Sequence, residues 1–249
     1  MLSPAALAVI AVSIIATSFL SGIFGMAGGL ILLGLMLFYL DVAPAMVLFG
    51  AIQITANGWR AILWRHHVRW PIIWRYIVGS TAMFLALRSV AFLPDKAMMY
   101  LGLGLLPLLV DRLPKRWAPD ITRPGIPYLC GAVIILLQLL AGATGHVLDQ
   151  FFQRSNLDRR TIVATKAVTQ CTGHFYRIAY FGSFADAFDV TVPWWAYIAA
   201  IGLSITGTSL AAIALERMSD ASFRLWSRRI VMAVSIGFLV RGVWLLVEG

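Results

Sequence analysis

The sequence predicts an all-α polytopic membrane protein made of two inverted repeats, and three observations support this fold class. The chain of 249 residues is 60% hydrophobic and only 12% charged, about half the charged fraction of soluble domains. Residues 1–40 and 190–215 contain no acidic, basic or histidine residue. Because a spanning helix needs about 20 mostly apolar residues, these runs are typical of transmembrane segments. The third observation is a polar pattern that occurs twice within this apolar sequence.

The two copies of the pattern share a glutamine, a threonine and an arginine at the same spacing. They are Gln53, Thr55, Asn57 and Arg60 in the first copy, and Gln170, Thr172, His174 and Arg177 in the second, at an offset of 117 residues. The same offset relates the glycine pairs Gly25/Gly28 and Gly142/Gly145, and the dipeptides Leu40-Asp41 and Leu157-Asp158. A duplicated unit that carries polar residues through an apolar setting indicates a transporter with its site between the repeats.

The hydrophobic pattern divides into ten segments, five in each repeat. The first repeat, 1–112, contains 4–24, 25–40, 43–64, 71–93 and 95–112; the second, 125–249, contains 125–141, 142–155, 159–182, 192–215 and 228–248. A proline-rich and charged cytoplasmic linker, 113–124, joins the repeats. The second segment of each set is short and begins at a glycine cluster. These segments either cross as ordinary spans or form re-entrant or broken helical hairpins, which gives eight to ten transmembrane helices.

Basic residues crowd four connections and set the expected orientation. These connections are 65–69, 112–123, 154–160 and 217–229, whereas 183–191 contains Asp186 and Asp189 and no basic residue. Cytoplasmic loops of membrane proteins carry the excess of Lys and Arg, so we expect both termini outside the cell inner (plasma) membrane. The repeats then run in opposite directions. The net charge of +9 is explained by these loops, and no nucleic-acid partner is expected.

Polar residues on one face of a predicted helix form the candidate binding site in each repeat. They are Lys166, Gln170, His174 and Arg177 in the second repeat, and Gly50, Gln53, Asn57 and Arg60 in the first. Such groups are costly in lipid and should face protein or a water-filled cavity. Arginine, lysine and amide donors suit a small oxyanion. Two alternatives stay open: Arg60 snorkels to the headgroups, and the Gln and Thr side chains hydrogen-bond between helices.

The glycine clusters are the second candidate element of the site. Their residues are Gly25, Gly28 and Gly29 in the first repeat, and Gly142, Thr144 and Gly145 in the second. They either break a helix and present a helix N-terminus to an anion, or allow close helix packing. His146 and Asp149, three residues apart, are a candidate proton relay. The favoured alternative is that 146–155 is an amphipathic stretch lining a wet vestibule.

These residues resemble the sulfite exporter TauE/SafE (TSUP) family. The resemblance rests on the glycine-rich segment Ser21 to Gly29, on Asn57 to Arg60 followed by a basic turn ending in Val68-Arg69-Trp70, and on Gly142 to Gly145, Leu157 to Arg160, Ala164-Thr165, His174 and Arg177. It covers nearly the whole chain. The chain has Leu30-Ile31-Leu32 where the family often has a proline. The resemblance implies transport, often export, of small sulfur-containing or carboxylate anions such as sulfite, sulfoacetate or other organosulfonates.

The sequence therefore predicts a secondary transporter, expected to export a sulfite-like or organosulfonate anion bound between the repeats. The alternatives are a transporter or channel for another small organic or inorganic anion, with or without proton coupling, and a non-transporting membrane assembly subunit. Acidic residues are too sparse within the predicted spans for an enzyme. We expect no cofactor and no metal; the partners are the small anionic substrate and the lipid bilayer, with a homo-oligomer left open.

Overall fold

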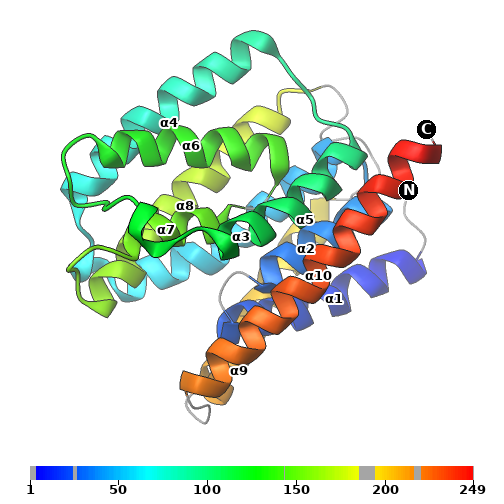
Figure 1. The fold of residues 1–249 in the computed structure, drawn as a ribbon. Coiled ribbons are helices and arrows are strands. Elements are labelled where there is room, and N and C mark those ends of the chain that lie inside the picture. Colours follow the sequence, from blue (N-terminus) through cyan, green and yellow to red (C-terminus); the bar gives the residue numbers. More distant parts are fainter. Residues whose placement is uncertain (1–3, 25–26, 143, 185–193, 216–219, 249) are drawn as a thin grey trace.

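A computed structural model describes residues 4–24, 27–142, 144–184, 194–215 and 220–248. In these residues the chain forms ten α-helices and two short 3₁₀ turns, with no strand (Figure 1). The helices are α1 (Pro4–Phe24), α2 (Ala27–Tyr39), α3 (Val42–Leu63), α4 (Trp70–Val90), α5 (Lys96–Arg112), α6 (Ile126–Ala141), α7 (Gly145–Phe152), α8 (Arg159–Phe181), α9 (Trp194–Leu215) and α10 (Asp220–Glu248). The predicted all-α fold class is confirmed.

The helix boundaries follow the predicted segments closely, with one clear difference. The last helix, α10, begins at Asp220 rather than at 228. Within the described part of the chain, three helices are long and apolar enough to span a membrane by length and composition: Val42–Leu63, Trp70–Val90 and Arg228–Glu248. Four residues used in the sequence argument lie outside the described residues, namely Gly25, Asp186, Asp189 and Arg217.

The two short helices, α2 and α7, are the second elements of the predicted repeats. They have 13 and 8 residues, which corresponds to lengths of about 20 Å and 12 Å. The hydrocarbon core of a bilayer is about 30 Å thick, so neither helix crosses it alone. This favours the broken-hairpin arrangement over ordinary spans, with α1 and α2 forming one hairpin and α6 and α7 the other.

Two helices of the first half pack against helices of the second half, an arrangement that we call exchanged packing. In the repeat register, α1 corresponds to α6 and α4 to α9. The structure packs α4 against α6 and α1 against α9, and the remaining corresponding pairs, α3 with α8 and α5 with α10, pack against each other. Small residues line these contacts: Gly79 and Gly131 allow close approach of α4 and α6, and Ser18 Oγ lies 3.3 Å from Ser204 Oγ between α1 and α9. Small residues drive such packing in lipid, where the hydrophobic effect does not.

The central helices α3 and α8 run antiparallel. From one end of the pair to the other, the contacts join Phe49 to Arg177, Ile54 to Cys171, and Trp64 to Arg160. Cys171 donates through Sγ to the Ile54 carbonyl oxygen at 3.7 Å, and these two residues are 117 apart in the chain. Contact between equivalent residues is what a two-fold axis between the helices requires, as in inverted repeats.

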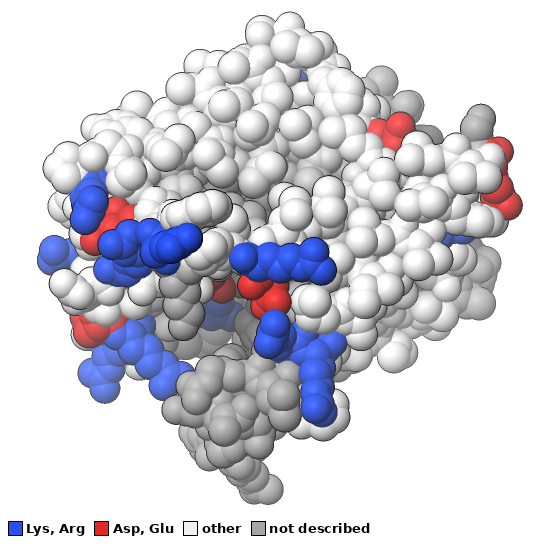
Figure 2. All heavy atoms as spheres, in the orientation of Figure 1, with Lys and Arg blue, Asp and Glu red and all other residues white. Residues whose placement is uncertain are grey.

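The basic residues are concentrated on part of the surface. In Figure 2, Lys and Arg side chains gather mainly on the left and lower parts of the view, and acidic side chains mark the right edge. Both chain ends lie on the right in Figure 1, which has the same orientation. The positive charge and the termini are therefore largely segregated.

The close approach at Gly131 gives a prediction about stability. A Cβ there would overlap the Tyr76 carbonyl oxygen and lie 2.8 Å from the Ser80 amide nitrogen, and neither backbone atom can rotate away. We expect Gly131→Ala to destabilise the protein by about 1–3 kcal/mol through overpacking. The control is Gly202→Ala, because a Cβ at Gly202 meets no atom within 4 Å. Thermal unfolding in detergent measures both, and equal melting temperatures would contradict the packing.

The two aspartates that begin α3 and α8 give a second prediction. The Asp158 carboxylate accepts hydrogen bonds from the Thr161 hydroxyl and from the Arg160 and Thr161 amides, which hold its pKa below the usual range. Asp41 makes no such cap and pairs instead with Lys96 at 2.9 Å, a contact that contributes little when exposed.

Asp158→Ala should therefore lower the melting temperature more than Asp41→Ala at neutral pH. A depressed pKa stabilises the folded state above the unfolded pKa, and this contribution is lost as the pH falls through the folded pKa. The difference between the variants should accordingly disappear in acid. A difference that grows in acid would show that the Asp158 cap is not its source.

Candidate anion-binding site

A small cavity of about 50 Å³, which we call the central cavity, lies where the two hairpins and the antiparallel pair α3 and α8 meet. This volume exceeds the roughly 10–15 Å³ that a cavity needs to hold one water. Eight of the residues proposed from the sequence line it: Gly29, Gln53, Gly142, Thr144, Gly145, Gln170, His174 and Arg177. Its other lining residues are Leu30, Phe49, Tyr76, Ile134, Gln138 and Leu148. The cavity therefore takes residues from both halves of the chain.

Arg177 provides the charge of the cavity. The residue is 1% exposed, and its Nη2 donates to the carbonyl oxygens of Gly142 and, at 3.5 Å, of Gln138. These are carbonyls at the C-terminal end of α6, where the helix dipole is negative and attracts a cation. The guanidinium carbon also lies 4.9 Å from the centre of the Phe49 ring, a cation–π contact. Nε and Nη1 have no partner among the described residues.

Three further side chains bring unused polar atoms to the same place, among them Tyr76, whose buried hydroxyl has no partner among the described residues. Gln138 Nε2 and His174 Nδ1 are buried and have no hydrogen-bond partner among the described residues. The hydroxyl of Thr144 donates to Gln138 Oε1 at 3.4 Å, which orients the amide. No acidic side chain is among the residues that line the cavity. Buried polar groups are normally paired, so this cluster of unpaired nitrogens around one cation is suited to an anionic ligand.

The N-terminal ends of the two short helices also face the cavity. At the start of α2, Gly29 and Leu30 line it, and at the start of α7, Thr144 and Gly145 do so. Thr144 makes no side-chain cap for α7. The first N–H groups of a helix have no intrahelical partner, and the dipole favours negative charge there. Both helix ends thus add to the positive potential that Arg177 creates.

Glycine is required at several of these positions for reasons that differ. A Cβ at Gly29 would lie 2.9 Å from Gln53 Nε2, and one at Gly28 would overlap the backbone of α1. Gly28 therefore serves close packing and Gly29 opens the cavity, so both interpretations of the first glycine cluster apply, each to a different residue. Gly142 has φ of +83°, which turns the chain sharply between α6 and α7.

The remaining proposed residues lie elsewhere. Asn57 is 4% exposed and donates to the Gln53 carbonyl oxygen at 2.9 Å. Arg60 is half-buried near the end of α3 and does not line the cavity. Lys166 forms an ion pair with Asp149. The residues that share one face of α8 thus lie at different depths along the helix, and those from Gln170 onward line the cavity.

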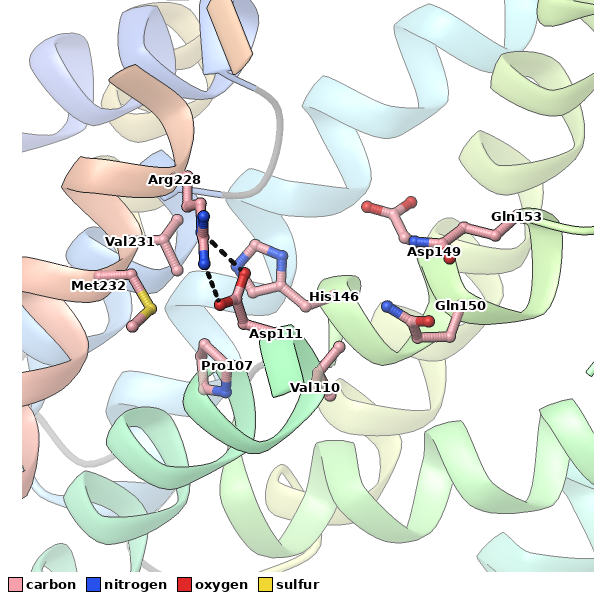
Figure 3. Close-up of a pocket in the computed structure, with 10 residues that line it drawn as sticks. All are labelled: Pro107, Val110, Asp111, His146, Asp149, Gln150, Gln153, Arg228, Val231 and Met232. Carbon is pink, nitrogen blue, oxygen red and sulfur yellow. Dashed lines mark hydrogen bonds and ion pairs between the residues drawn. The ribbon is translucent and has the colours of Figure 1, made fainter. Parts of the chain in front are cut away.

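His146 and Asp149 line a second, larger cavity of about 270 Å³ between α5, α7 and α10, which we call the vestibule. Figure 3 shows its walls, with Asp111 and Arg228 joined by two hydrogen bonds of 3.1 and 2.9 Å. Gln150 of α7 and Gln153, which directly follows α7, also line it. The arrangement matches the amphipathic interpretation of this stretch. Proton relay by His146 and Asp149 stays a prediction.

Sequence reasoning missed six lining residues, and three of them, Phe49, Tyr76 and Gln138, are aromatic or polar. Gln138 stands alone in an apolar segment and shares no helical spacing with other polar residues. The repeat register offered one signal, because residue 138 corresponds to Ser21, another polar residue in an apolar span. Phe49 and Tyr76 are indistinguishable from ordinary core aromatics in the sequence.

A model of the family described as Sulfite exporter TauE/SafE matches residues 9–238 of the chain. The match spans both halves and includes every residue that lines the central cavity. Comparison with curated proteins finds no match, and comparison with solved structures finds none either.

The break between α6 and α7 gives a prediction with a matched control. Gly142 and Gly125 have nearly the same unusual backbone, with φ of +83° and +88°. Alanine at either position incurs the strain of positive φ, about 1–3 kcal/mol. A Cβ at Gly142 would in addition lie 2.7 Å from Met99 Cε, whereas at Gly125 it meets nothing within 4 Å.

Gly142→Ala should therefore destabilise the protein more than Gly125→Ala, by about 1 kcal/mol, because the crowded atoms are ends of flexible side chains that can shift. Part of this additional loss of stability comes from displacement of the Gly142 carbonyl oxygen, which accepts a hydrogen bond from Arg177. Melting temperatures of the two variants in the same detergent provide the comparison. If Gly125→Ala proves the more harmful, the crowding around Gly142 is wrongly described.

Proposed function

The chain belongs to the sulfite exporter TauE/SafE family, and on that premise we propose that it is a secondary transporter that exports a small sulfur-containing oxyanion across the cell inner membrane. The observation that carries the proposal is the set of unpaired nitrogens on Arg177, Gln138 and His174, which surround a cavity without an acidic residue. The anion would bind between the two repeats, 1–112 and 125–249.

The electrostatics of the cavity favour an anion over a cation or a neutral solute. A buried charge without a counter-charge is costly, and in this cavity only carbonyl dipoles and an aromatic ring offset Arg177. An oxyanion supplies the missing charge and accepts from the unused Nε and Nη1, since guanidinium donates in pairs to oxyanions. The amide of Gln138 and the ring of His174 add donors at other oxygens.

The size of the cavity favours sulfite over larger organosulfonates. The cavity has a volume of only about 50 Å³, and sulfite has the fewest heavy atoms of the candidate substrates. Sulfoacetate carries a carboxymethyl group in addition, so it would have to extend toward the vestibule. Sulfite is therefore the leading substrate, and organosulfonates are the alternative.

Residues outside the cavity contribute at longer range. Arg60 adds positive potential near Lys166, whose own charge is paired with Asp149, and Asn57 holds the backbone of α3 beside Gln53. The segregation of basic residues away from the chain ends (Figure 2) supports cytoplasmic loops and external termini. In that orientation the vestibule opens to the cytoplasm, because it lies at the C-terminal end of α5 beside the linker.

Export of an anion requires no coupling ion on energetic grounds. An inside-negative potential drives each negative charge outward by about 2.3 kcal/mol per 100 mV. A channel for the same anion would dissipate that gradient without saturating, whereas a carrier saturates and shows trans-stimulation. An assembly subunit would show no flux at all after purification.

The test is sulfite flux into proteoliposomes that contain the purified protein. Arg177→Gln should lower the initial rate by about 10- to 100-fold, because a hydrogen bond to a charged group contributes about 1.5–3 kcal/mol. Gln138→Leu, which keeps the shape and removes the donor, should lower it as well. Saturation with trans-stimulation should identify a carrier.

The matched control is Arg123→Gln, which removes the same charge from the exposed linker and should transport as the wild type does. Sulfite should raise the melting temperature of the wild type and of Arg123→Gln, since a ligand stabilises the state that binds it, and should leave Arg177→Gln unchanged. An Arg177→Gln protein that folds and transports like Arg123→Gln would refute the site.

A further inference from the structure

The helix α7 separates the vestibule from the central cavity. Its residues Gly145 and Leu148 line the central cavity. On the adjoining face of the same helix, His146, Asp149 and Gln150 line the vestibule, and Gln153 directly after the helix does so too. The two faces follow from the helical repeat, which brings residues three and four apart together. The barrier between the two cavities is therefore one helix thick at this point.

A single ion pair joins this barrier to the helix that carries the binding residues. Lys166 of α8 pairs with Asp149 of α7. Lys166 lies one turn, about 6 Å along the axis, before Gln170, which lines the central cavity. The side chains of Lys166 and Asp149 are 22% and 37% exposed, so the pair is within reach of solvent although it is largely covered.

We propose that an anion entering the vestibule binds Lys166, which lies behind the vestibule wall and is covered there by Asp149, a residue of that wall, in the conformation described here. The transported anion takes the place of the Asp149 carboxylate on Lys166, which releases α7 and opens the barrier to the central cavity. This inference rests on the proposed function, because it names the route by which the anion reaches Arg177.

The chemistry of the exchange is balanced. A carboxylate and a sulfite or sulfonate group both offer oxygens that accept from an ammonium group, so the anion replaces Asp149 without leaving Lys166 uncompensated. Release of Asp149 with no anion present would leave a largely buried ammonium unpaired, which is strongly unfavourable. Opening is thereby linked to the presence of the anion. Beyond Lys166, the same face of α8 continues with Gln170, His174 and Arg177.

The length of α7 and the way it begins are typical of a helix that can move. The helix has eight residues and no side-chain cap at its start, and the chain turns at Gly142 with positive φ just before it. Its counterpart α2 has 13 residues, most of them buried, and packs along α1. Leu148, Phe151 and Phe152 hold the apolar face of α7 against α4 and α6. On its polar face, the ion pair with Lys166 is the one side-chain polar contact to α8 among the described residues.

A second ion pair in the vestibule provides a control for substitutions of the Lys166–Asp149 pair. Asp111 and Arg228 form a second ion pair there, with distances of 3.1 and 2.9 Å, but they join α5 to α10 and not α7 to α8 (Figure 3). Replacing Asp111 by Asn makes the same chemical change as replacing Asp149 by Asn. Only the second change should affect the barrier.

The experiment measures access to the central cavity by thiol labelling. A cysteine is placed at Gln170 in a chain whose two native cysteines are replaced, Cys130→Ala and Cys171→Ala. Detergent-solubilised protein is treated with a small water-soluble methanethiosulfonate reagent. Asp149→Asn should raise the labelling rate by about tenfold or more, whereas Asp111→Asn should leave it unchanged and Asp149→Glu, which keeps the carboxylate, should keep it low. Size-exclusion profiles verify that each variant is folded.

A second arm tests the exchange with sodium methanesulfonate, which does not react with thiols, against sodium chloride at equal ionic strength. Methanesulfonate should raise labelling in the protein with an intact ion pair and have no effect in Asp149→Asn. Equal labelling of Asp149→Asn and Asp111→Asn overturns the barrier, and a methanesulfonate effect that persists in Asp149→Asn overturns the exchange. Since labelling requires no transport, failure of sulfite flux alone would count against the proposed function and not against this inference.

Discussion

The constraint on which the structure depends is the burial of Arg177 without an acidic partner. Inside a membrane protein such a charge must be offset locally, and the chain does so with carbonyls at the end of α6 and with the face of Phe49. Those carbonyls are free only because α6 ends at this depth, at Gly142. The broken hairpin is therefore a consequence of burying the arginine as much as a means of binding a ligand.

The same break creates a problem that the outer helices solve. Unpaired backbone groups at a helix end cannot face lipid, so the hairpin tips must be enclosed by protein. The exchanged packing of α1 with α9 and of α4 with α6 provides this enclosure, and it depends on small residues such as Gly79 and Gly131 that let helices approach closely. A substitution that disturbs the packing of α1 with α9 or of α4 with α6 therefore affects the cavity, because it changes how deeply the hairpin tips are buried and how well water is excluded from them.

The sequence predicted the helices and most of the cavity, and its failures have a common cause. Helical periodicity shows which residues share a face, so Gln170, His174 and Arg177 were found together. Periodicity does not show depth along that face, so Arg60 and Lys166 were assigned to the same site although neither lines the cavity. Gln138 was missed because a single polar residue in an apolar helix has no spacing to reveal it.

The depth of a residue along the helix also explains why the two copies of the polar pattern, on α3 and α8, differ in sequence. Near a two-fold axis, equivalent residues come close together, and two like charges 4 Å apart repel by about 4 kcal/mol at an effective dielectric constant of 20. A cavity of about 50 Å³ cannot hold a cation from each repeat on those terms. Both repeats have an arginine at the equivalent position, but only Arg177 lines the cavity and Arg60 lies outside it. The first repeat instead contributes Phe49, whose ring faces Arg177. The duplication supplies the scaffold for the cavity, and the loss of symmetry lets one repeat supply the charge.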